Sequence, residues 1–395
     1  MLCKIPILYL AIAGSCVAAQ EAAPADQAAA LNQAASNPIA YVYVSNIVNP
    51  NSSSKHDVYA FSAAANGSLT RLAGSPFPYD ASGMAAGTHY LFALNGEQID
   101  SYALQANGSL RLVSSIDAAA HADGFCGGIG PLKLDHSGQD VYNAIAEGDC
   151  EGFTFQTFAI NKMNGKLVYK GSSQEVFLSS SELDFVGNDM FAFTPICTDF
   201  DHEEVGYVSG FKRASDGSLT SAPFSNPGPT PKNTSNSYCP FTLATDPTNH
   251  MAALQQEEGF DGTAYGTPVI ATYSVTSTGK MTTTSAYQNM PHTRAGSRVM
   301  RMAPSGNLLA VGGTNGLELF LYNGASPSVY FKTLLTSGSI QNLAWDKNSH
   351  LYATEWTSNG NGKLYVFTVT STGVSQDPGS PYSIPNPDSL VVRSE

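Results

Sequence analysis

The sequence predicts an all-β protein, a seven-bladed β-propeller of four-stranded antiparallel blades with the ring closed by the C-terminal strand. Three observations predict it. One hairpin pattern recurs along the chain, a second hairpin precedes most of its copies, and the two chain ends supply complementary pieces of one blade. A period of about forty to sixty residues is typical of propellers and solenoids.

The recurring hairpin is a strand with an aromatic residue, a polar turn that contains glycine, and a second strand. Its Asn-Gly and Asp-Gly turns accept the positive φ that tight hairpins require. The copies of its first strand are 58–61, 99–102, 155–158, 208–211, 270–273, 317–320 and 364–367.

Another strand pair lies before most of these hairpins, around turns such as 135–138 and 246–249. Two hairpins in series make one four-stranded blade, whose strands we name A to D from the axis outward. The preceding strand pairs are 132–144, 183–193, 241–254, 299–311 and 343–353.

The chain ends predict how the ring closes. Residues 41–44 begin the first copy at strand B, with no strand A before them, whereas residues 389–392 end the chain as a strand A without a blade. We therefore expect Leu390 and Val391 to lie beside Val42. The alternative is an open solenoid with two frayed ends.

The N-terminus resembles a targeting segment, because Lys4 precedes an apolar run at 5–13 that is too short for a stable membrane anchor. Two cleavages fit it: a lipobox in which Cys16 is lipidated, or an ordinary signal-peptidase site at 17–19. Either predicts an extracytoplasmic protein, which is periplasmic, an outer-membrane lipoprotein or secreted. The predicted segments are a signal peptide at 1–19, a flexible linker at 20–38 and the propeller at 39–395.

The charge balance limits the partners. Lys and Arg number 19 against 32 Asp and Glu, a net charge of −13. Nucleic acid and anionic membrane surfaces are therefore poor partners, and contact with a membrane is expected only through an N-terminal lipid. We expect a monomer that holds a small molecule or a protein on one face.

That face is expected to carry the D–A and B–C connections, and we call it the loop face. Four cysteines of the mature chain fall on it, and an even number in an oxidising compartment predicts disulfides. Their spacing does not suit a zinc site. Three pairings are possible, and the shortest spans join Cys126 to Cys150 and Cys197 to Cys239.

Several segments resemble the β-propeller lactonase family, which includes 6-phosphogluconolactonases and YVTN-repeat proteins. They are the Pro-x-Gly-x-Leu-x-x-Val run at 304–311, the unit at 58–69 and the Ser-Pro-Phe at 75–77. The resemblance implies lactone opening by His, Glu and Arg side chains at the mouth of the central channel. The family's His-x-His and Asp-Leu-Gly types of segment are replaced here, at 239–242 and 181–184.

The B–C connections of three neighbouring blades are rich in carboxylates. Calcium takes oxygen ligands of this kind, and solvated surface charges are the alternative. No cofactor is required by the resemblance, and Ca²⁺ is the metal we consider. The candidate ligands are Asp199, Asp201, Glu203 and Glu257.

The connection that enters the sixth blade is the best candidate for chemistry. Arg298 could polarise a lactone carbonyl, with His292 or Glu258 as a base on water. An Arg satisfied by the acidic loops is the alternative. Further candidate binding residues are Arg294, Glu355 and Trp356.

Two functions remain open at this point. The first is a binding scaffold that lacks the family's catalytic residues, and the second is a hydrolase of a neutral sugar lactone or related ester. A phosphorylated substrate suits neither, because the acidic loops would repel it. The sequence contains no G-x-S-x-G, P-loop or H-E-x-x-H motif.

Overall fold

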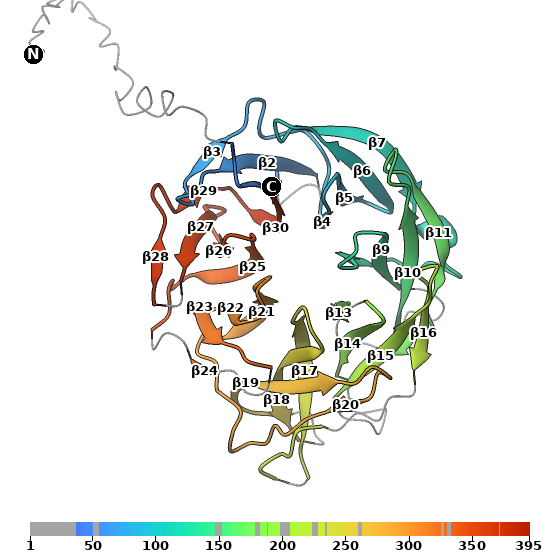
Figure 1. Ribbon diagram of the computed structural model, residues 1–395, viewed down its shortest axis with the longest axis vertical. Coiled ribbons are helices and arrows are strands. Elements are labelled where there is room, and N and C mark those ends of the chain that lie inside the picture. The colour runs from blue at the N-terminus through green and yellow to red at the C-terminus, as the bar shows by residue number, and fades with distance from the viewer. Residues whose placement is uncertain are drawn as a thin grey trace, which may run out of the picture. The chain divides into compact units, whose positions relative to one another are not determined.

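Seven antiparallel sheets surround a central axis in the computed structural model (Figure 1). The predicted seven-bladed propeller is therefore confirmed. No helix in the described part of the chain is long and apolar enough to cross a membrane. The structure describes residues 37–49, 55–146, 152–177, 182–187, 189–197, 206–222, 228–233, 235–259, 263–324, 328–329, 333–370 and 372–395.

The first four blades, with strands given in the order A to D, follow the predicted pattern of two hairpins in series. A fifth short strand, β12 (Val176–Phe177), pairs with β10, and η2 (Ala119–His121) is a turn of 3-10 helix. The strands are β30 (Pro387–Ser394), β1 (Ala40–Ile47), β2 (His56–Ala63) and β3 (Leu69–Arg71) in blade 1; β4 (Met84–Ala86), β5 (Tyr90–Asn95), β6 (Gln98–Leu104) and β7 (Leu110–Asp117) in blade 2; β8 (Ile129–Leu134), β9 (Asp140–Ala146), β10 (Gly152–Ile160) and β11 (Leu167–Ser172) in blade 3; β13 (Asp184–Val186), β14 (Phe191–Ile196), β15 (Tyr207–Arg213) and β16 (Leu219–Ala222) in blade 4.

The last three blades repeat the arrangement, and β29 (Tyr382–Ser383) is an extra strand beside β27. The strands are β17 (Ser237–Thr245), β18 (His250–Glu258), β19 (Ala264–Val275) and β20 (Met281–Thr282) in blade 5; β21 (Ser297–Met302), β22 (Leu308–Gly313), β23 (Gly316–Leu321) and β24 (Ser328–Val329) in blade 6; β25 (Ser339–Trp345), β26 (His350–Trp356), β27 (Lys363–Val369) and β28 (Val374–Gln376) in blade 7.

The C-terminal strand closes the ring, as the chain ends predict. In the antiparallel pair of β1 and β30, Val42 lies opposite Val392 and Val44 lies opposite Leu390. Strand A of the first blade therefore comes from the far end of the chain. The open-solenoid alternative is excluded.

The hydrophobic core consists of seven apolar clusters, one between each pair of neighbouring blades. The cluster at the closing junction packs Val42 and Val44 of blade 1 against Leu364 and Val366 of blade 7. This junction is thus built like the other six, and burial of apolar surface stabilises the ring all the way round.

Some of the glycine turns also connect a blade to the one before it. The Tyr43 hydroxyl of strand B in blade 1 donates to the Gly108 carbonyl in blade 2, at 2.8 Å. Gly108 has a φ of +77°, and a β-carbon there would lie 2.3 Å from the Tyr41 ring. Tyr142 and Gly217 repeat the same bond between blades 3 and 4, also at 2.8 Å. The recurring Asn-Gly turns therefore serve blade packing as well as chain reversal.

Candidate functional site

A disulfide crosses from blade 4 to blade 5 on the loop face. Cys197 directly follows β14, and its bond to Cys239 spans 42 residues with a Cα–Cα distance of 5.0 Å. Cys239 lies inside β17, rather than before strand A as the sequence suggested, because that strand begins at Ser237. Cys126 is also disulfide-bonded, and Cys150 lies outside the described residues.

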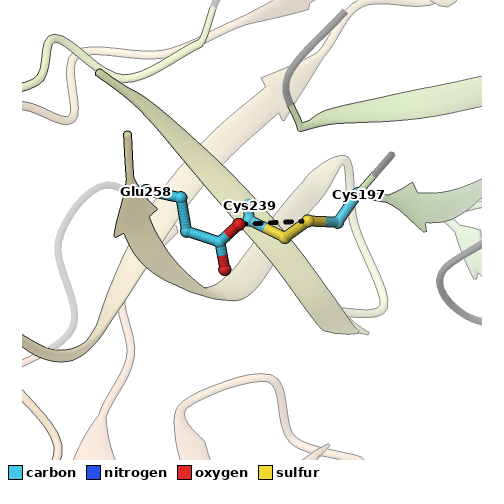
Figure 2. A group of neighbouring side chains, drawn as sticks. All are labelled: Cys197, Cys239 and Glu258. Atoms are coloured by element: carbon cyan, nitrogen blue, oxygen red, sulfur yellow. Dashed lines mark hydrogen bonds between the residues drawn. A yellow bond between two sulfur atoms is a disulfide. The ribbon is translucent and has the colours of Figure 1, made fainter. Parts of the chain in front are cut away.

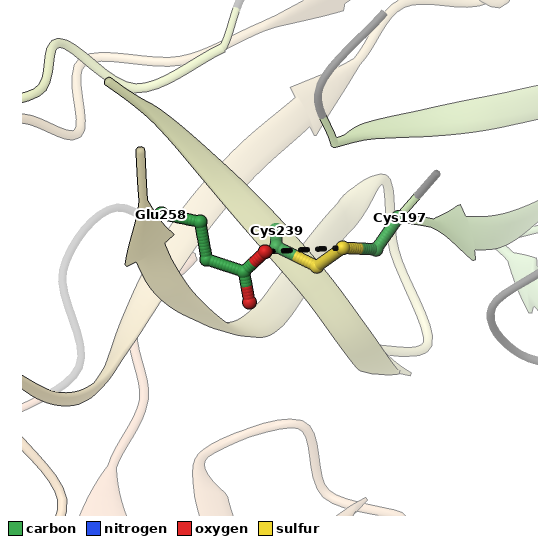
Figure 3. The surroundings of a disulfide bond; sticks show 3 residues. All are labelled: Cys197, Cys239 and Glu258. Carbon is green, nitrogen blue, oxygen red and sulfur yellow. Dashed lines mark hydrogen bonds between the residues drawn. A yellow bond between two sulfur atoms is a disulfide. The ribbon is translucent and has the colours of Figure 1, made fainter. Parts of the chain in front are cut away.

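Glu258 lies against this disulfide (Figure 2, Figure 3). One carboxyl oxygen is 3.7 Å from the Cys197 sulfur, which carries no hydrogen to donate while the disulfide is intact. Burial raises the pKa of the Glu258 carboxyl. Although these three side chains are close enough to surround an ion, sulfurs bonded to each other are not thiolate ligands, so the group is not a metal site.

The hairpin that carries Glu258 is longer than predicted. Glu257 and Glu258 belong to β18 and pair with Tyr265 and Ala264 of β19, so they are strand residues rather than loop residues. A register shift between Gln255 and Glu257 separates this tip from the body of the blade. Shifts of this kind re-aim side chains at the rim of a sheet.

The tip of the hairpin forms one wall of an open cavity of about 610 Å³, which we call the blade-5 pocket. Its other walls come from the D–A connections on either side of blade 5, so it lies on the loop face. The lining residues are Lys232, Asn233, Asn236, Tyr238, Glu257, Tyr265, Gly266, Thr267, Val269, Tyr287 and His292.

Two aromatic rings of the pocket are available to a ligand. Tyr265 is 45% exposed and Tyr287 is 41% exposed, whereas Tyr238 is buried beneath them in strand A. Burial, and then the charge of Glu257, raise the pKa of Tyr238 to about 12, so its hydroxyl stays protonated at neutral pH. Exposed aromatic rings in a concave surface are typical of ligand sites.

Polar groups converge on the same space. The Asn236 side-chain amide donates to one oxygen of Glu257 at 2.9 Å, and Nδ1 of His292 is 3.0 Å from the Thr267 hydroxyl. These bonds orient both side chains and leave the second Glu257 oxygen and Nε2 of His292 for other partners. The pocket therefore offers donors, acceptors and aromatic faces together.

Glu318 holds the connection that carries His292, and sequence reasoning missed it. Its side chain is 1% exposed in β23, and its carboxylate accepts the backbone N–H of Arg294 at 2.8 Å. Burial raises the pKa of Glu318, while the N–H groups of Arg294 and Ala295 oppose that rise. The available signal was one acidic residue within the apolar strand 316–321.

Only one of the three predicted catalytic residues lines the blade-5 pocket. His292 lines the blade-5 pocket, but Glu258 and Arg298 do not. Arg298 lies within strand A, at a register shift between Ser297 and Val299, where it is exposed. It forms no hydrogen bond or ion pair to the described residues, and most carboxylates of the acidic loops lie outside them.

The predicted binding residues differ from one another. Arg294 is exposed beside the pocket, and Trp356 is 43% exposed at the end of strand B in blade 7. Glu355 is buried instead, and it accepts hydrogen bonds from Lys363 Nζ at 3.0 Å and from the Tyr365 hydroxyl at 2.9 Å. Its carboxylate is thus used within blade 7.

The calcium prediction is left without a structural test. Asp199, Asp201 and Glu203 lie outside the described residues, and Glu257 is a wall of the blade-5 pocket that already accepts from Asn236. The involvement of these carboxylates in calcium binding stays a prediction.

Comparison with known proteins supports the fold but not an activity. No protein-family model matches the chain, and no curated protein does. The periplasmic gluconolactonase PpgL of Pseudomonas aeruginosa is similar in structure, with a TM-score of 0.58 and 16% identity over 90% of this chain and 99% of that one. A candidate 6-phosphogluconolactonase of Bacteroides fragilis gives 0.56 and 12% over 91% and 99%, and a protein of Lactobacillus plantarum gives 0.57 and 14% over 89% and 99%.

The resemblance to lactonase propellers is therefore confirmed at the level of fold. At such low identity a shared fold does not carry residue roles or substrates.

Proposed function

We propose that this protein is an exported binding propeller that holds a neutral, polyhydroxylated small molecule in the blade-5 pocket. The observation that carries the proposal is the pairing of two half-exposed tyrosine rings, Tyr265 and Tyr287, with Asn, Glu and His side chains around one cavity. Rings pack against the C–H faces of a sugar-like molecule, and the polar groups bond its hydroxyls.

The charge of the site favours a neutral ligand. The pocket contains Glu257 and Lys232 within a protein of net charge −13. An anionic ligand would meet both the Glu257 carboxylate and the negative field of the whole molecule. A hydroxyl, by contrast, can donate to Glu257 and accept from Asn236.

The Cys197–Cys239 disulfide, which joins blade 4 to blade 5, supports export, because disulfides persist in oxidising compartments. The predicted signal peptide at 1–19 agrees with this, and a gluconolactonase with the same fold is periplasmic. We therefore propose an extracytoplasmic location, as a periplasmic, lipid-anchored or secreted molecule.

Binding is tested by titrating the mature protein with a panel of neutral mono- and oligosaccharides and following heat of binding. We expect Tyr265→Ala and Tyr287→Ala to weaken the affinity for the best ligand roughly tenfold, which is the loss of about 1.4 kcal/mol. Trp356→Ala is the matched control, since it removes an equally exposed ring of the loop face outside the pocket. Equal loss in all three variants, or no binding by the panel, would contradict the proposal.

Opening of a neutral lactone in the same pocket is the second candidate. It is favoured by His292 and Glu257, which face one cavity and could each take a proton from an attacking water. Ring opening releases acid, so a pH-indicator assay over a lactone panel tests it. The candidate requires turnover that falls at least tenfold in His292→Ala and stays unchanged in Arg298→Ala.

A further inference from the structure

A second cavity lies at the other end of the propeller, on the face of the A–B turns. It has a volume of about 430 Å³, and every residue that lines it belongs to a strand A or an A–B turn of blades 3 to 7. Because strands A surround the axis, this turn-face cavity lies near the axis of the propeller. It shares no residue with the blade-5 pocket.

Lys133 brings one positive charge to this cavity. Its acidic partner is Asp184, and both carboxyl oxygens of Asp184 are in use. The Lys133 ammonium contacts Oδ1 of Asp184, while Oδ2 accepts the backbone N–H and the hydroxyl of Thr245 at 2.9 and 3.1 Å. Burial alone would raise the pKa of Asp184, but Lys133 and the Thr245 N–H lower it below its usual value. The Lys133 side chain remains 35% exposed.

Arg301 brings the second charge and keeps half of its guanidinium available. Its Nη1 donates to Glu182 at 2.7 Å and to the Met300 carbonyl at 2.8 Å. Its Nε and Nη2, which form the side-on edge that binds carboxylates in a bidentate manner, have no partner in the described residues. The side chain is 43% exposed.

Apolar groups complete the cavity. Trp345 donates its indole N–H to the Arg301 carbonyl at 3.2 Å, so its ring is fixed next to the arginine. Met302, Pro304 and Ala344 also line the space. Asp246 also lines the space, and its buried carboxylate accepts the backbone N–H of His250 and lies 3.0 Å from Nδ1 of the same residue.

We propose that the turn-face cavity binds a small organic monocarboxylate with an apolar body. The carboxylate accepts from the free edge of Arg301 and from Lys133, and the body packs against Trp345 and Met302. A second negative charge on the ligand would lie near the two carboxylates that line the cavity, Asp184 and Asp246, so the proposal is limited to monocarboxylates. The site is separate from the one of the proposed function, in place and in chemistry.

The test is calorimetric titration with 3-phenylpropionate, compared with 3-phenylpropanamide of the same shape. We expect saturable binding of the acid in the millimolar range or tighter, at least tenfold tighter than the amide. Arg301→Gln should abolish that preference, and Arg301→Lys should keep part of it. Arg298→Gln is the matched control, because it removes an exposed arginine near the other end of the same strand.

Equal affinity for acid and amide, no saturable binding of either, or an equal loss in Arg298→Gln would overturn the proposal. If Arg301→Gln fails to fold, Ala344→Leu is the second variant. It fills the cavity from its apolar side and should weaken the binding of 3-phenylpropionate as much as Arg301→Gln is expected to. Tyr265→Ala should leave binding of 3-phenylpropionate unchanged, so failure here and failure of the saccharide site are distinguishable.

Discussion

Blades 5 and 7 carry acidic residues at the same topological position, the end of strand B on the loop face, and use them in opposite ways. In blade 7 the carboxylate of Glu355 is buried and accepts hydrogen bonds from Lys363 and Tyr365. In blade 5 Glu257 lies half-buried at the wall of an open pocket, where its one hydrogen bond to the described residues comes from Asn236.

The difference comes from the strand C residues that face the two glutamates. Strand C of blade 7 presents a basic and a phenolic side chain to Glu355. Gly338 lets the connection that enters blade 7 lie directly on this carboxyl group, since a β-carbon there would be 2.1 Å from it. Strand C of blade 5 presents Tyr265 and a glycine instead, and a disulfide holds the blade. One blade is closed by polar contacts, whereas the other is braced covalently and left open.

The largest expected effect comes from removing the brace. The Cys197→Ser, Cys239→Ser double variant loses a crosslink over 42 residues, which is worth about 4 kcal/mol of unfolding free energy in the chain-entropy treatment. Because Tyr238 of the pocket is next to Cys239, saccharide binding should weaken too. Denaturant unfolding followed by fluorescence measures the first effect. An unchanged midpoint would show that the hydrophobic junctions alone hold blade 5.

The next effect separates the two glutamates. Glu355→Ala should lower the free energy of unfolding by about 2 kcal/mol, because Lys363 and Tyr365 lose their common acceptor. Glu257→Ala, the matched change in blade 5, should stay within about 0.5 kcal/mol and weaken saccharide binding instead. Thermal unfolding and calorimetry on both variants measure this. Similar losses of unfolding free energy in Glu355→Ala and Glu257→Ala would contradict the idea that only blade 7 uses its glutamate for stability.

The fold could be predicted because its signals are local and repeated. Each Asn-Gly or Asp-Gly turn marks one outer hairpin, and the unmatched strands at the two ends determine closure, so the pairing of 389–392 with 41–44 followed from counting strands. The register did not follow from it, since Val42 lies opposite Val392 rather than Leu390 or Val391. Boundaries were less predictable. Strands β17, β18 and β21 run further toward the loop face than the turn residues indicated, which moves Cys239, Glu258 and Arg298 into strands.

The face that carries the candidate site could be predicted, but the full set of its lining residues could not. Topology put His292 and Glu257 on one face, and both line the blade-5 pocket. The tyrosines were missed, because their exposure depends on how two D–A connections fold around the hairpin tip. The roles of Glu355 and Glu257 could not be separated either, since the deciding contacts come from residues on strand C and not from the glutamates themselves.

A smaller effect, dependent on pH, is expected at the closing strand. His56 has Nδ1 2.9 Å from Asp80 and Nε2 3.3 Å from Asp388 of β30. Burial opposes its charge, but the two carboxylates outweigh this and raise the pKa of His56. The folded chain thus binds this proton more tightly, so the stabilisation is present below about pH 6.5 and is lost as the pH rises through the raised pKa.

His56→Gln should remove that dependence. Between pH 6 and pH 8 the free energy of unfolding of the wild type should fall by on the order of 1 kcal/mol more than that of the variant. His136 and His350, whose pKa values are also raised, remain in both proteins and contribute equally to each slope. Urea unfolding at several pH values gives the comparison, and parallel curves for the two proteins would assign closure to the backbone pairing alone.

The smallest effect concerns the carboxyl beside the disulfide. Burial raises the pKa of Glu258, and its carboxyl contacts the Cys197 sulfur rather than a hydrogen-bond donor, so its charged form is disfavoured in the folded state. Glu258→Gln should therefore stabilise the protein by about 0.5 kcal/mol at pH 8 and give no gain below about pH 4. Glu257→Gln, next in sequence and bonded to Asn236, should show no such gain. If both variants gain equally, general relief of negative charge is the cause; a gain restricted to Glu258 means that blade 5 retains an uncompensated carboxyl of the kind that blade 7 neutralises with Lys363.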